Sequence, residues 1–239
     1  MARAPWDITP EMFLSVSETE RLVRHVRNQA QRGGARQRLS RHLDRVIVEL
    51  LLFSGLRCSE FCGVRVADTV IATGDPTIIV RGKRGGGRTV WLPGHVNRLI
   101  GTFAAEVRPD LLPEHVHPDD PDQPLVFSER HRPYERTGLY RRVVRVLTEA
   151  GLGSRASVQL LRHTYGYLAY LHSGGNLLFV QRQLGHAHPI ITSIYAQFVE
   201  ESYAGLADAV GQRYMPERRA VIRTKSRVRT WAAQISRHR

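Results

Sequence analysis

Hydrophobic residues recur along most of this chain at the three- to four-residue spacing of helices that bury one face. The pattern predicts a series of helices joined by short connections, the first of which is the glycine-containing loop 31–38. The expected helices cover residues 18–31, about twelve residues ending near Gly55, 59–66, 95–107, 138–151, 159–174, 176–187, a short segment from Pro189 through Tyr195, and 199–211.

Three short segments have a different pattern, with neighbouring β-branched or large apolar residues. "PTIIVRG" and "RTVWLP" are separated by "KRGGG", which predicts an antiparallel hairpin with a flexible tip. "LVF" at 125–127 is expected to form a short strand of its own. The fold class that follows is α+β, mostly α-helical, with a small antiparallel β-hairpin or sheet.

Local signals mark some of the helix ends. Ser17 and Glu20 have the S-x-x-E spacing of a capping box at the start of the first helix. Gly55 is suited to end the second helix, because glycine readily adopts the left-handed conformation of a helix C-terminus. Pro189 suits the first turn of a short helix.

The composition is that of a globular protein. A chain of 239 residues, 42% of them hydrophobic, is long enough for one large domain, or for one domain with a tail. It contains no apolar run of about 18 residues and no secretory signal. Cys58 and Cys62 lie four residues apart on one expected helix, which favours buried free thiols over a disulfide or a zinc site and predicts a cytoplasmic protein. We interpret the histidine- and aspartate-rich stretch 108–124 as a surface loop and not as a metal site.

The charge balance indicates a polyanionic partner. The formal net charge is +13, and nine lysines and arginines stand against one acidic residue between Arg213 and Arg239. A basic chain of this size is typical of nucleic-acid binders. The charge by itself predicts a partner and no reaction.

Lysine is rare in this chain, since Lys83 and Lys225 are the only two among 35 basic residues. An arginine keeps its proton in a protein, whereas a lysine can release one. Lys83, in the hairpin tip "GKRGGG", is therefore a candidate for proton transfer, with chance placement as the alternative. The tip lacks the G-x-x-x-x-G-K-[ST] pattern of a phosphate-binding loop and lies between strands, so we do not expect a nucleotide site.

Other polar residues gather around predicted helix ends. Arg57 follows the helix-ending glycine in "SGLRCSE", and Glu60 is placed to brace it. Gln159 and Arg162 are three apart on one helix face. His186 precedes Tyr195 by nine residues in "QLGHAHPIITSIY". Each feature alone is compatible with an ordinary surface or packing residue.

Together these pieces resemble the catalytic domain of the tyrosine recombinases, also called phage integrases. The matching elements are "GLRCSE", the hairpin "GKRGGGRTVWLP", "LLRHT" and "QLGHAHPIITSIY". They occur in the order found in that family, and the resemblance covers roughly residues 12–210. It implies a tyrosine recombinase catalytic-domain-like fold over residues 1–211, followed by a basic tail over 212–239.

The resemblance also implies a reaction, which needs neither a metal nor a cofactor. Arg57 and Arg162 are expected to bind the non-bridging oxygens of a DNA phosphate, and His186 to add a hydrogen bond. Tyr195 is the expected nucleophile, which forms a 3′-phosphotyrosine bond, while Lys83 protonates the departing 5′ oxygen. We expect the arginines to favour the phenolate form of the tyrosine.

The implied activity is site-specific recombination on double-stranded DNA, in integration, excision or resolution, for example of a mobile element. The implied assembly is a homo-oligomer, a tetramer on DNA. A related activity, relaxation of supercoils or resolution of hairpins, would use the same chemistry. The alternative is a non-catalytic DNA-binding or regulatory protein derived from a recombinase.

Two departures from the family pattern bear on these expectations. Gln159 stands where the family usually has histidine, and an amide donates hydrogen bonds but does not titrate. His163 is about 100° around the helix from Arg162, so we expect a supporting, packing role for it.

About 15 residues precede the first helix, so the DNA-clamping domain of most relatives is expected to be absent. The tail then has three interpretations: contact with phosphates, docking on a protein partner as an amphipathic helix, or solvation.

Overall fold

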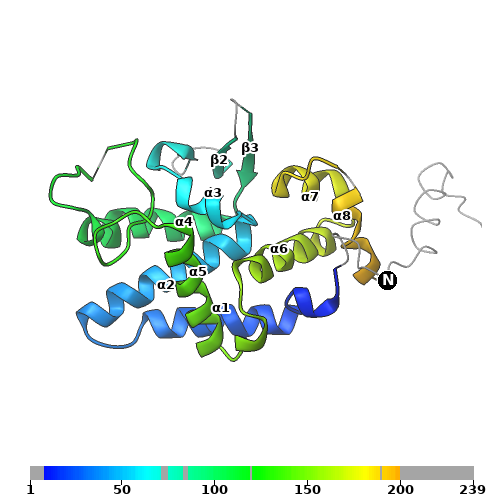
Figure 1. Cartoon of the computed structure of the whole chain (residues 1–239), viewed down its shortest axis with the longest axis horizontal. Helices are drawn as coiled ribbons and strands as arrows, with labels where there is room; N and C mark the ends of the chain where they lie inside the picture. The colour runs from blue at the N-terminus through cyan, green and yellow to red at the C-terminus, as the bar shows by residue number, and fades with distance from the viewer. Residues whose placement is uncertain (1–7, 71–74, 83–85, 119, 189, 200–239) are drawn as a thin grey trace, which may run out of the picture. The chain divides into compact units, whose positions relative to one another are not determined.

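The computed structural model describes residues 8–70, 75–82, 86–118, 120–188 and 190–199, which form one compact unit (Figure 1). The α-helices are α1 Val16–Ala30, α2 Ala35–Ser54, α3 Cys58–Gly63, α4 Gly94–Thr102, α5 Arg136–Glu149, α6 Val158–His172, α7 Leu177–Leu184 and α8 Ile190–Ser193. The strands are β1 Thr69–Val70, β2 Thr77–Arg81 and β3 Gly87–Trp91. Short 3₁₀ or π turns are η1 Pro10–Met12, η2 Val66–Asp68, η4 Phe103–Val107, η5 Arg108–Leu111, η6 Gly153–Arg155 and η7 Ala196–Phe198.

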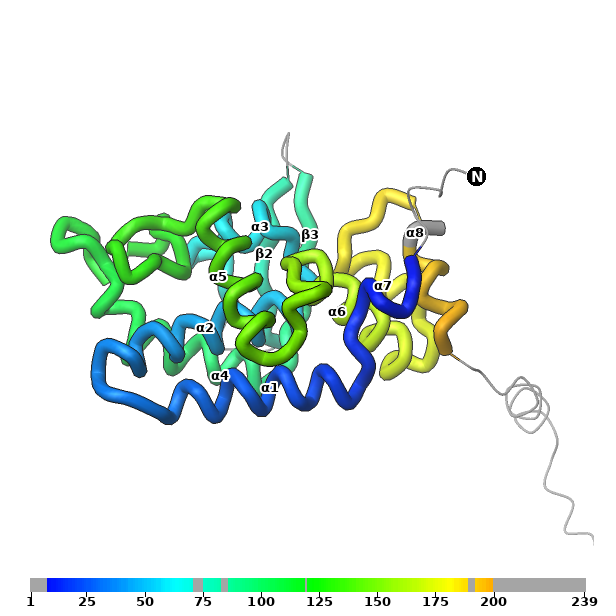
Figure 2. Tube along the Cα trace, turned by 60° about the horizontal axis from the view of Figure 1, so that its bottom comes forward, coloured from blue at the N-terminus to red at the C-terminus, as the bar shows by residue number. Residues whose placement is uncertain are grey.

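Helix α2 is the central element of the core. The helices α1, α4, α5 and α6 all pack against it, as the two views of the chain show (Figures 1 and 2). Its run "VIVELLL" is apolar at nearly every position, and residues 46–52 are all buried. A helix that is apolar all round is stable only when neighbours cover every side, so this sequence requires a central position. The expected mostly α-helical fold with a small antiparallel sheet is confirmed.

The capping box of α1 lies two residues before the predicted one. The Ser15 hydroxyl accepts a hydrogen bond from the Glu18 backbone, and the Glu18 carboxylate accepts one from the Ser15 backbone. The sequence "SVSETE" contains two overlapping S-x-x-E patterns, so the prediction of Ser17 and Glu20 chose the wrong one. With Ser15 as the N-cap, Thr19 and Leu22 are buried in the core. Glu18 also forms an ion pair with Arg155.

The second helix begins earlier than predicted and ends where predicted. It starts at Ala35, so the expected loop 31–38 shrinks to its first four residues. Gly55 follows it with φ 63°, in the left-handed conformation, and donates its backbone N–H to the Leu51 carbonyl. The glycine therefore stops the longest helix at the point where the candidate site begins.

The sheet is antiparallel with the order β1-β2-β3. The predicted hairpin of β2 and β3 is confirmed, and its register pairs the fully buried Ile78 with Val90. The predicted strand at 125–127 is wrong, because this segment makes a single isolated bridge, Phe127↔Pro133. Leu125 and Phe127 are each 1% exposed, so the apolar run reflects burial in the core and not sheet pairing.

A buried arginine organises the proline-rich connection after α4. The helical pattern predicted over 95–107 continues past α4 as the π turn η4, and Arg108 follows it at 2% exposure. The Arg108 guanidinium donates hydrogen bonds to the carbonyls of Pro118, Pro124 and Leu125. These hydrogen bonds hold part of the proline-rich connection against the core. No spacing in the sequence predicts this role of Arg108.

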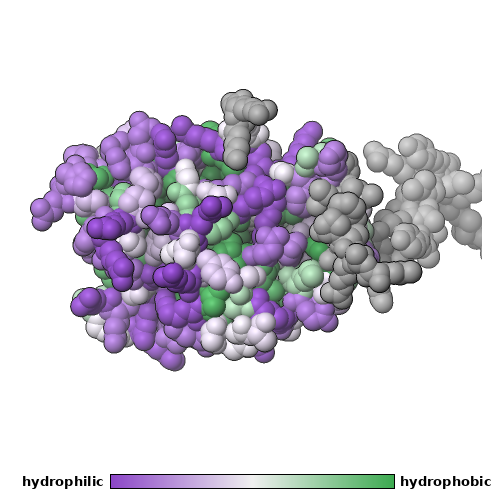
Figure 3. All heavy atoms as spheres, viewed as in Figure 1, coloured by the Kyte–Doolittle hydropathy of each residue, from purple (hydrophilic) through white to green (hydrophobic). Residues whose placement is uncertain are grey.

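The surface agrees with this arrangement. On the face seen in Figure 3, hydrophilic residues cover most of the area and hydrophobic ones appear between them. Within the described ranges, none of the helices is long and apolar enough to cross a membrane. The predicted helix 199–211, the tail 212–239, Pro189 and the hairpin tip with Lys83 lie largely or wholly outside the described residues.

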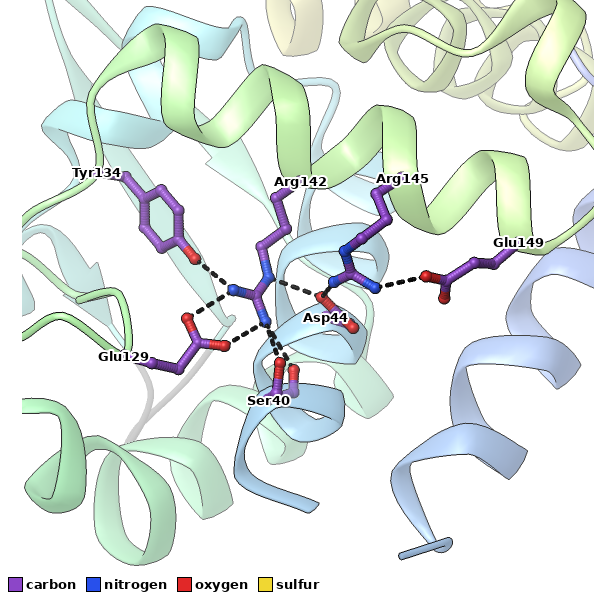
Figure 4. Close-up of polar contacts among 7 residues, drawn as sticks. All are labelled: Ser40, Asp44, Glu129, Tyr134, Arg142, Arg145 and Glu149. Carbon is purple, nitrogen blue, oxygen red and sulfur yellow. Dashed lines mark hydrogen bonds and ion pairs between the residues drawn. The ribbon is translucent and has the colours of Figure 1, made fainter. Parts of the chain in front are cut away.

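A polar cluster joins α5 to α2 (Figure 4). Arg142 donates to Asp44, Glu129, the Tyr134 hydroxyl and Ser40, and its side chain is 11% exposed. Burial alone would raise the pKa of Glu129, but the Arg142 hydrogen bonds and charge lower that pKa to about 2. The guanidinium thus bridges the buried Asp44, which Arg145 also contacts, and the partly exposed Glu129.

We expect Arg142→Ala to lower the free energy of unfolding by about 1.5–3 kcal/mol, because Asp44 then keeps only Arg145 as a counter-charge and Glu129 loses its hydrogen bonds from Arg142. Arg141→Ala is the matched control on the same helix, since Arg141 is exposed and should change stability by less than about 0.5 kcal/mol. Urea denaturation followed by circular dichroism measures both. Equal stabilities of the two variants would contradict the assigned role of the cluster.

Candidate active site

The predicted site residues converge on one cavity of about 810 Å³ between α3, α6 and the segment that follows α7. Six of the predicted side chains line it: Arg57, Gln159, Arg162, His163, His186 and Tyr195. Glu60 lies behind Arg57 as its ion-pair partner. Lys83 is outside the described residues, so its expected role stays a prediction.

Arg162 is the more deeply buried of the two arginines expected to bind the phosphate, at 4% exposure. Its guanidinium donates one hydrogen bond to the Gly55 carbonyl and one to the Leu184 carbonyl, the latter at 2.6 Å. These carbonyls lie at the ends of α2 and α7, where backbone acceptors lack partners and the helix dipole is negative. Burial, and next the nearby charge of Arg57, lower the pKa of Arg162 to about 10, so it stays charged at neutral pH.

Arg57 begins α3 and is held in place by Glu60. Its Nη1 lies 2.8 Å from Glu60 Oε1, and its backbone N–H donates to Glu60 Oε2 at 2.7 Å. The expected bracing of Arg57 by Glu60 is therefore present in the structure. The Arg57 side chain is still 44% exposed, so its guanidinium remains accessible to a ligand in the cavity.

Arg88 on β3 is a member of this arrangement that the sequence analysis missed. Its Nη1 and Nη2 donate to the two Glu60 oxygens at 2.6 and 2.9 Å, and its Nε donates to the Gln183 carbonyl at 2.8 Å. Burial would raise the pKa of Glu60, but Arg88 and Arg57 lower it to about 2. An arginine in a short strand carries no distinctive signal, and only the fold places it beside α3. Glu60 thereby links the base of the hairpin to Arg57.

Tyr195 follows α8 in a turn, and its ring is 1% exposed. The ring packs in a small second core with Phe13, Tyr165, Val180 and Leu184. Burial raises the pKa of Tyr195 to about 12, while the charge of Arg162 lowers it only in part. The charge of Arg162 thus acts in the expected direction and favours the phenolate, but desolvation of the phenol outweighs it and keeps Tyr195 protonated at neutral pH.

His163 lines the cavity and makes polar contacts there that the sequence analysis did not predict. Its Nδ1 is 3.2 Å from the Tyr195 hydroxyl oxygen, and its Nε2 is 3.0 Å from the Gln159 amide nitrogen. The 100° between Arg162 and His163 on the helix does not keep His163 out of the cavity, because its partner is Gln159, four residues earlier on the same face. Burial, and then Arg162, lower the pKa of His163 to about 4, so its imidazole is neutral at pH 7.

His186 is also neutral in this site. Burial, followed by the charges of Arg162 and Arg57, lowers its pKa to about 4. Its Nδ1 lies 3.0 Å from the hydroxyl of Thr192, which is fully buried. Thr192 also accepts, through its carbonyl, a hydrogen bond from the Tyr195 backbone N–H at 3.2 Å. One threonine thus ties the histidine to the turn that carries the tyrosine.

The chemistry that this cavity offers is recognition of an anion next to a hydroxyl. Two guanidinium groups face the same space from α3 and α6, and the charges of both add to burial in lowering the pKa of His186. Guanidinium forks match the paired oxygens of a phosphate, and a bound anion would relieve the mutual repulsion of the cations. These features suit a phosphate ester as the ligand.

Comparison with known proteins identifies the class. The sequence model of the phage integrase family matches residues 13–201, and the chain belongs to this family.

Two relatives show how far the likeness extends. Tyrosine recombinase XerC of Lactobacillus delbrueckii subsp. bulgaricus is 30% identical over 153 residues, which cover 64% of this chain and 49% of the relative. Tyrosine recombinase XerH of Helicobacter pylori is 27% identical over 157 residues, 65% of this chain and 41% of that protein. The chain thus spans about half the length of the curated relatives it matches.

Solved structures agree in fold. The XerH site-specific recombinase bound to palindromic difH substrate, in a post-cleavage complex, superposes with a TM-score of 0.65 at 23% identity, covering 84% of this chain and 53% of that one. The Tn1549 transposon integrase in complex with transposon right end DNA gives a TM-score of 0.61 at 17% identity, covering 87% and 67%.

Gly166 provides a test of the packing of Tyr195. A methyl group at Gly166 would lie 2.5 Å from the Tyr195 hydroxyl oxygen and closer still to Cζ. We expect Gly166→Ala to displace the ring and to lower the free energy of unfolding by about 1–3 kcal/mol, measured by urea denaturation.

Gly138→Ala on α5 is the matched control, since a methyl there meets only Tyr134 Cδ1, at 3.8 Å. This variant should be neutral or slightly stabilised, because alanine loses less backbone entropy in a helix than glycine. If the two variants were equally stable, the close packing of Tyr195 on α6 would be refuted.

Proposed function

We propose that this protein breaks and rejoins DNA strands at specific sites through a covalent bond between Tyr195 and a 3′-phosphate. The observation that carries the proposal is the convergence of Arg57, Arg162, His186 and Tyr195 on one cavity, although they lie on separate elements of the chain. Membership of the phage integrase family supports it.

The geometry supports a division of roles. Arg57, at the open side, and Arg162, at the base, bind the non-bridging oxygens of the scissile phosphate. His186, neutral and held by Thr192, donates a hydrogen bond to the same phosphate. These groups stabilise the charge that accumulates as the phosphorus becomes five-coordinate.

The covalent step exchanges one phosphate ester for another. The Tyr195 oxygen forms a bond to phosphorus, the bond from phosphorus to the 5′ oxygen breaks, and Lys83 gives its proton to that oxygen. The phosphotyrosine bond retains the linkage, so a second 5′-hydroxyl can reverse the step without ATP. Because Tyr195 is 1% exposed in the free protein, DNA binding must open its packing against α6 for attack.

The proposed partner is double-stranded DNA, and the proposed assembly is a tetramer on two duplexes. The net charge of +13 supports a polyanionic ligand, and the titles of the XerH and Tn1549 integrase structures describe DNA complexes of those proteins. Contact of the basic tail 212–239 with DNA or with a protein partner, and action in the cytoplasm, belong to the same proposal.

The second candidate is a DNA-binding protein that has lost catalysis. Gln159 in place of the usual histidine and the buried phenol of Tyr195 favour this alternative. The two candidates differ in whether a covalent protein–DNA adduct forms.

Duplexes taken from the DNA that flanks the coding gene, each with a nick near the scissile position, test the proposal. We expect the full chain to form an adduct that survives detergent, and Tyr195→Phe to form none, because phenylalanine lacks the attacking oxygen. Tyr140→Phe is the control, since Tyr140 is 47% exposed and outside the cavity. Denaturing gel electrophoresis measures the adduct.

An adduct that persists in Tyr195→Phe would refute the nucleophile. A wild-type chain that binds these duplexes without any adduct would favour the non-catalytic candidate.

A further inference from the structure

The hydroxyl of Tyr195 has a histidine partner that the proposed roles leave unused. His163 Nδ1 lies 3.2 Å from the Tyr195 oxygen, and the same imidazole contacts the Gln159 amide nitrogen at 3.0 Å through Nε2. The three side chains form a continuous row along α6, from Gln159 through His163 to the ring that rests on Gly166. The row ends on the atom that must lose a proton when it attacks phosphorus.

Gln159 determines what His163 can do. A neutral imidazole carries one hydrogen, on either Nδ1 or Nε2. When the amide NH₂ of Gln159 faces Nε2, as here, Nε2 accepts, Nδ1 carries the hydrogen, and the phenol oxygen is held as an acceptor. When the amide turns its oxygen to Nε2, the hydrogen moves to Nε2, and Nδ1 presents its lone pair to the phenol.

We propose that His163 is the group that removes the proton from Tyr195, and that Gln159 is a positioning residue that selects the required tautomer. This inference rests on the proposed function. In the attacking state the Gln159 oxygen accepts Nε2–H, and Nδ1 accepts the phenolic proton as the oxygen–phosphorus bond forms. The bond from phosphorus to the 5′ oxygen breaks, and that oxygen takes a proton from Lys83. His163 therefore gains one proton and Lys83 loses one.

The environment of His163 suits this role. Burial and Arg162 keep the imidazole neutral, so its lone pair is available at pH 7. A phosphate bound by Arg162 would offset the positive charge that depresses the basicity of His163. The phenol becomes a much stronger acid as its oxygen bonds to phosphorus, so the proton transfer is favoured in the course of the attack and not before it.

The row also accounts for the departure at position 159. A glutamine does not take up a proton itself, but it can orient a histidine four residues further along the helix. The base is then His163, the side chain that the structure places on the phenol.

Rates of adduct formation on a nicked duplex that the wild-type chain cleaves test the inference. We expect His163→Asn, which keeps a polar group where Nδ1 was, to slow the reaction by about 10²-fold or more. Replacing Tyr195 by 3-fluorotyrosine, whose phenol is more acidic, should restore at least about tenfold of that loss, because a more acidic nucleophile depends less on a base. The same replacement in the wild type should have little effect.

His172→Asn on the same helix is the control, because His172 is exposed near the end of α6, outside the cavity. Nitrogen-15 NMR of the free protein adds an independent measurement of the tautomer. The wild type should carry its His163 hydrogen on Nδ1, and Gln159→Glu, whose carboxylate only accepts, should move it to Nε2.

The outcomes separate the two proposals. If the wild type forms an adduct and His163→Asn forms it equally fast, or if 3-fluorotyrosine gives no recovery, His163 is not the base and the recombinase function stands. If the wild type forms no adduct on any flanking duplex, both fall. An unchanged tautomer in Gln159→Glu would remove Gln159 from the mechanism.

Discussion

The site depends on one buried cation. Arg162 leaves the middle of α6 and ends on the Gly55 and Leu184 carbonyls, so its guanidinium fastens the C-terminal ends of α2 and α7 to each other. Both helices stop there because Gly55 and Gly185 adopt left-handed conformations, each with φ 63°. Without these stops the two carbonyls would be used inside the helices, and the arginine would have no acceptors at this depth.

The remaining groups are arranged around that anchor. Arg57 lies two residues after Gly55, which ends α2, and His186 lies immediately after Gly185, which ends α7. The same two glycines therefore set the direction of both side chains. Burial, with the nearby positive charge as the second cause, keeps the histidines neutral, and burial keeps the phenol protonated. The free site is therefore in a resting state whose protonation an arriving phosphate would change. The polar cluster around Arg142 lies outside this cavity and joins α5 to the N-terminal half of α2, through Ser40 and Asp44.

Much of this arrangement could be predicted from the sequence, because local rules determine it. Gly55 as the end of a helix and the hairpin follow from patterns within short segments, whereas the convergence of Arg162 and Tyr195 is implied only by the resemblance to the phage integrases. The strand at 125–127, the role of Arg88 and the contacts of His163 could not be predicted. Each depends on which distant segment packs against it, and the burial of Tyr195 depends on Gly166 giving its ring room on α6.

The central claim is that Arg162 acts through its charge on an anionic phosphate, and a neutral substrate tests it most directly. Adduct formation by the wild type and by Arg162→Ala should be compared on a nicked duplex with an ordinary scissile phosphate and on one with a methylphosphonate, in which a methyl group replaces a charged oxygen. We expect the variant to lose about 10²–10³-fold in rate on the phosphate and much less on the methylphosphonate. An equal loss on both substrates would mean that Arg162 serves only to hold the helices together, and would contradict the account.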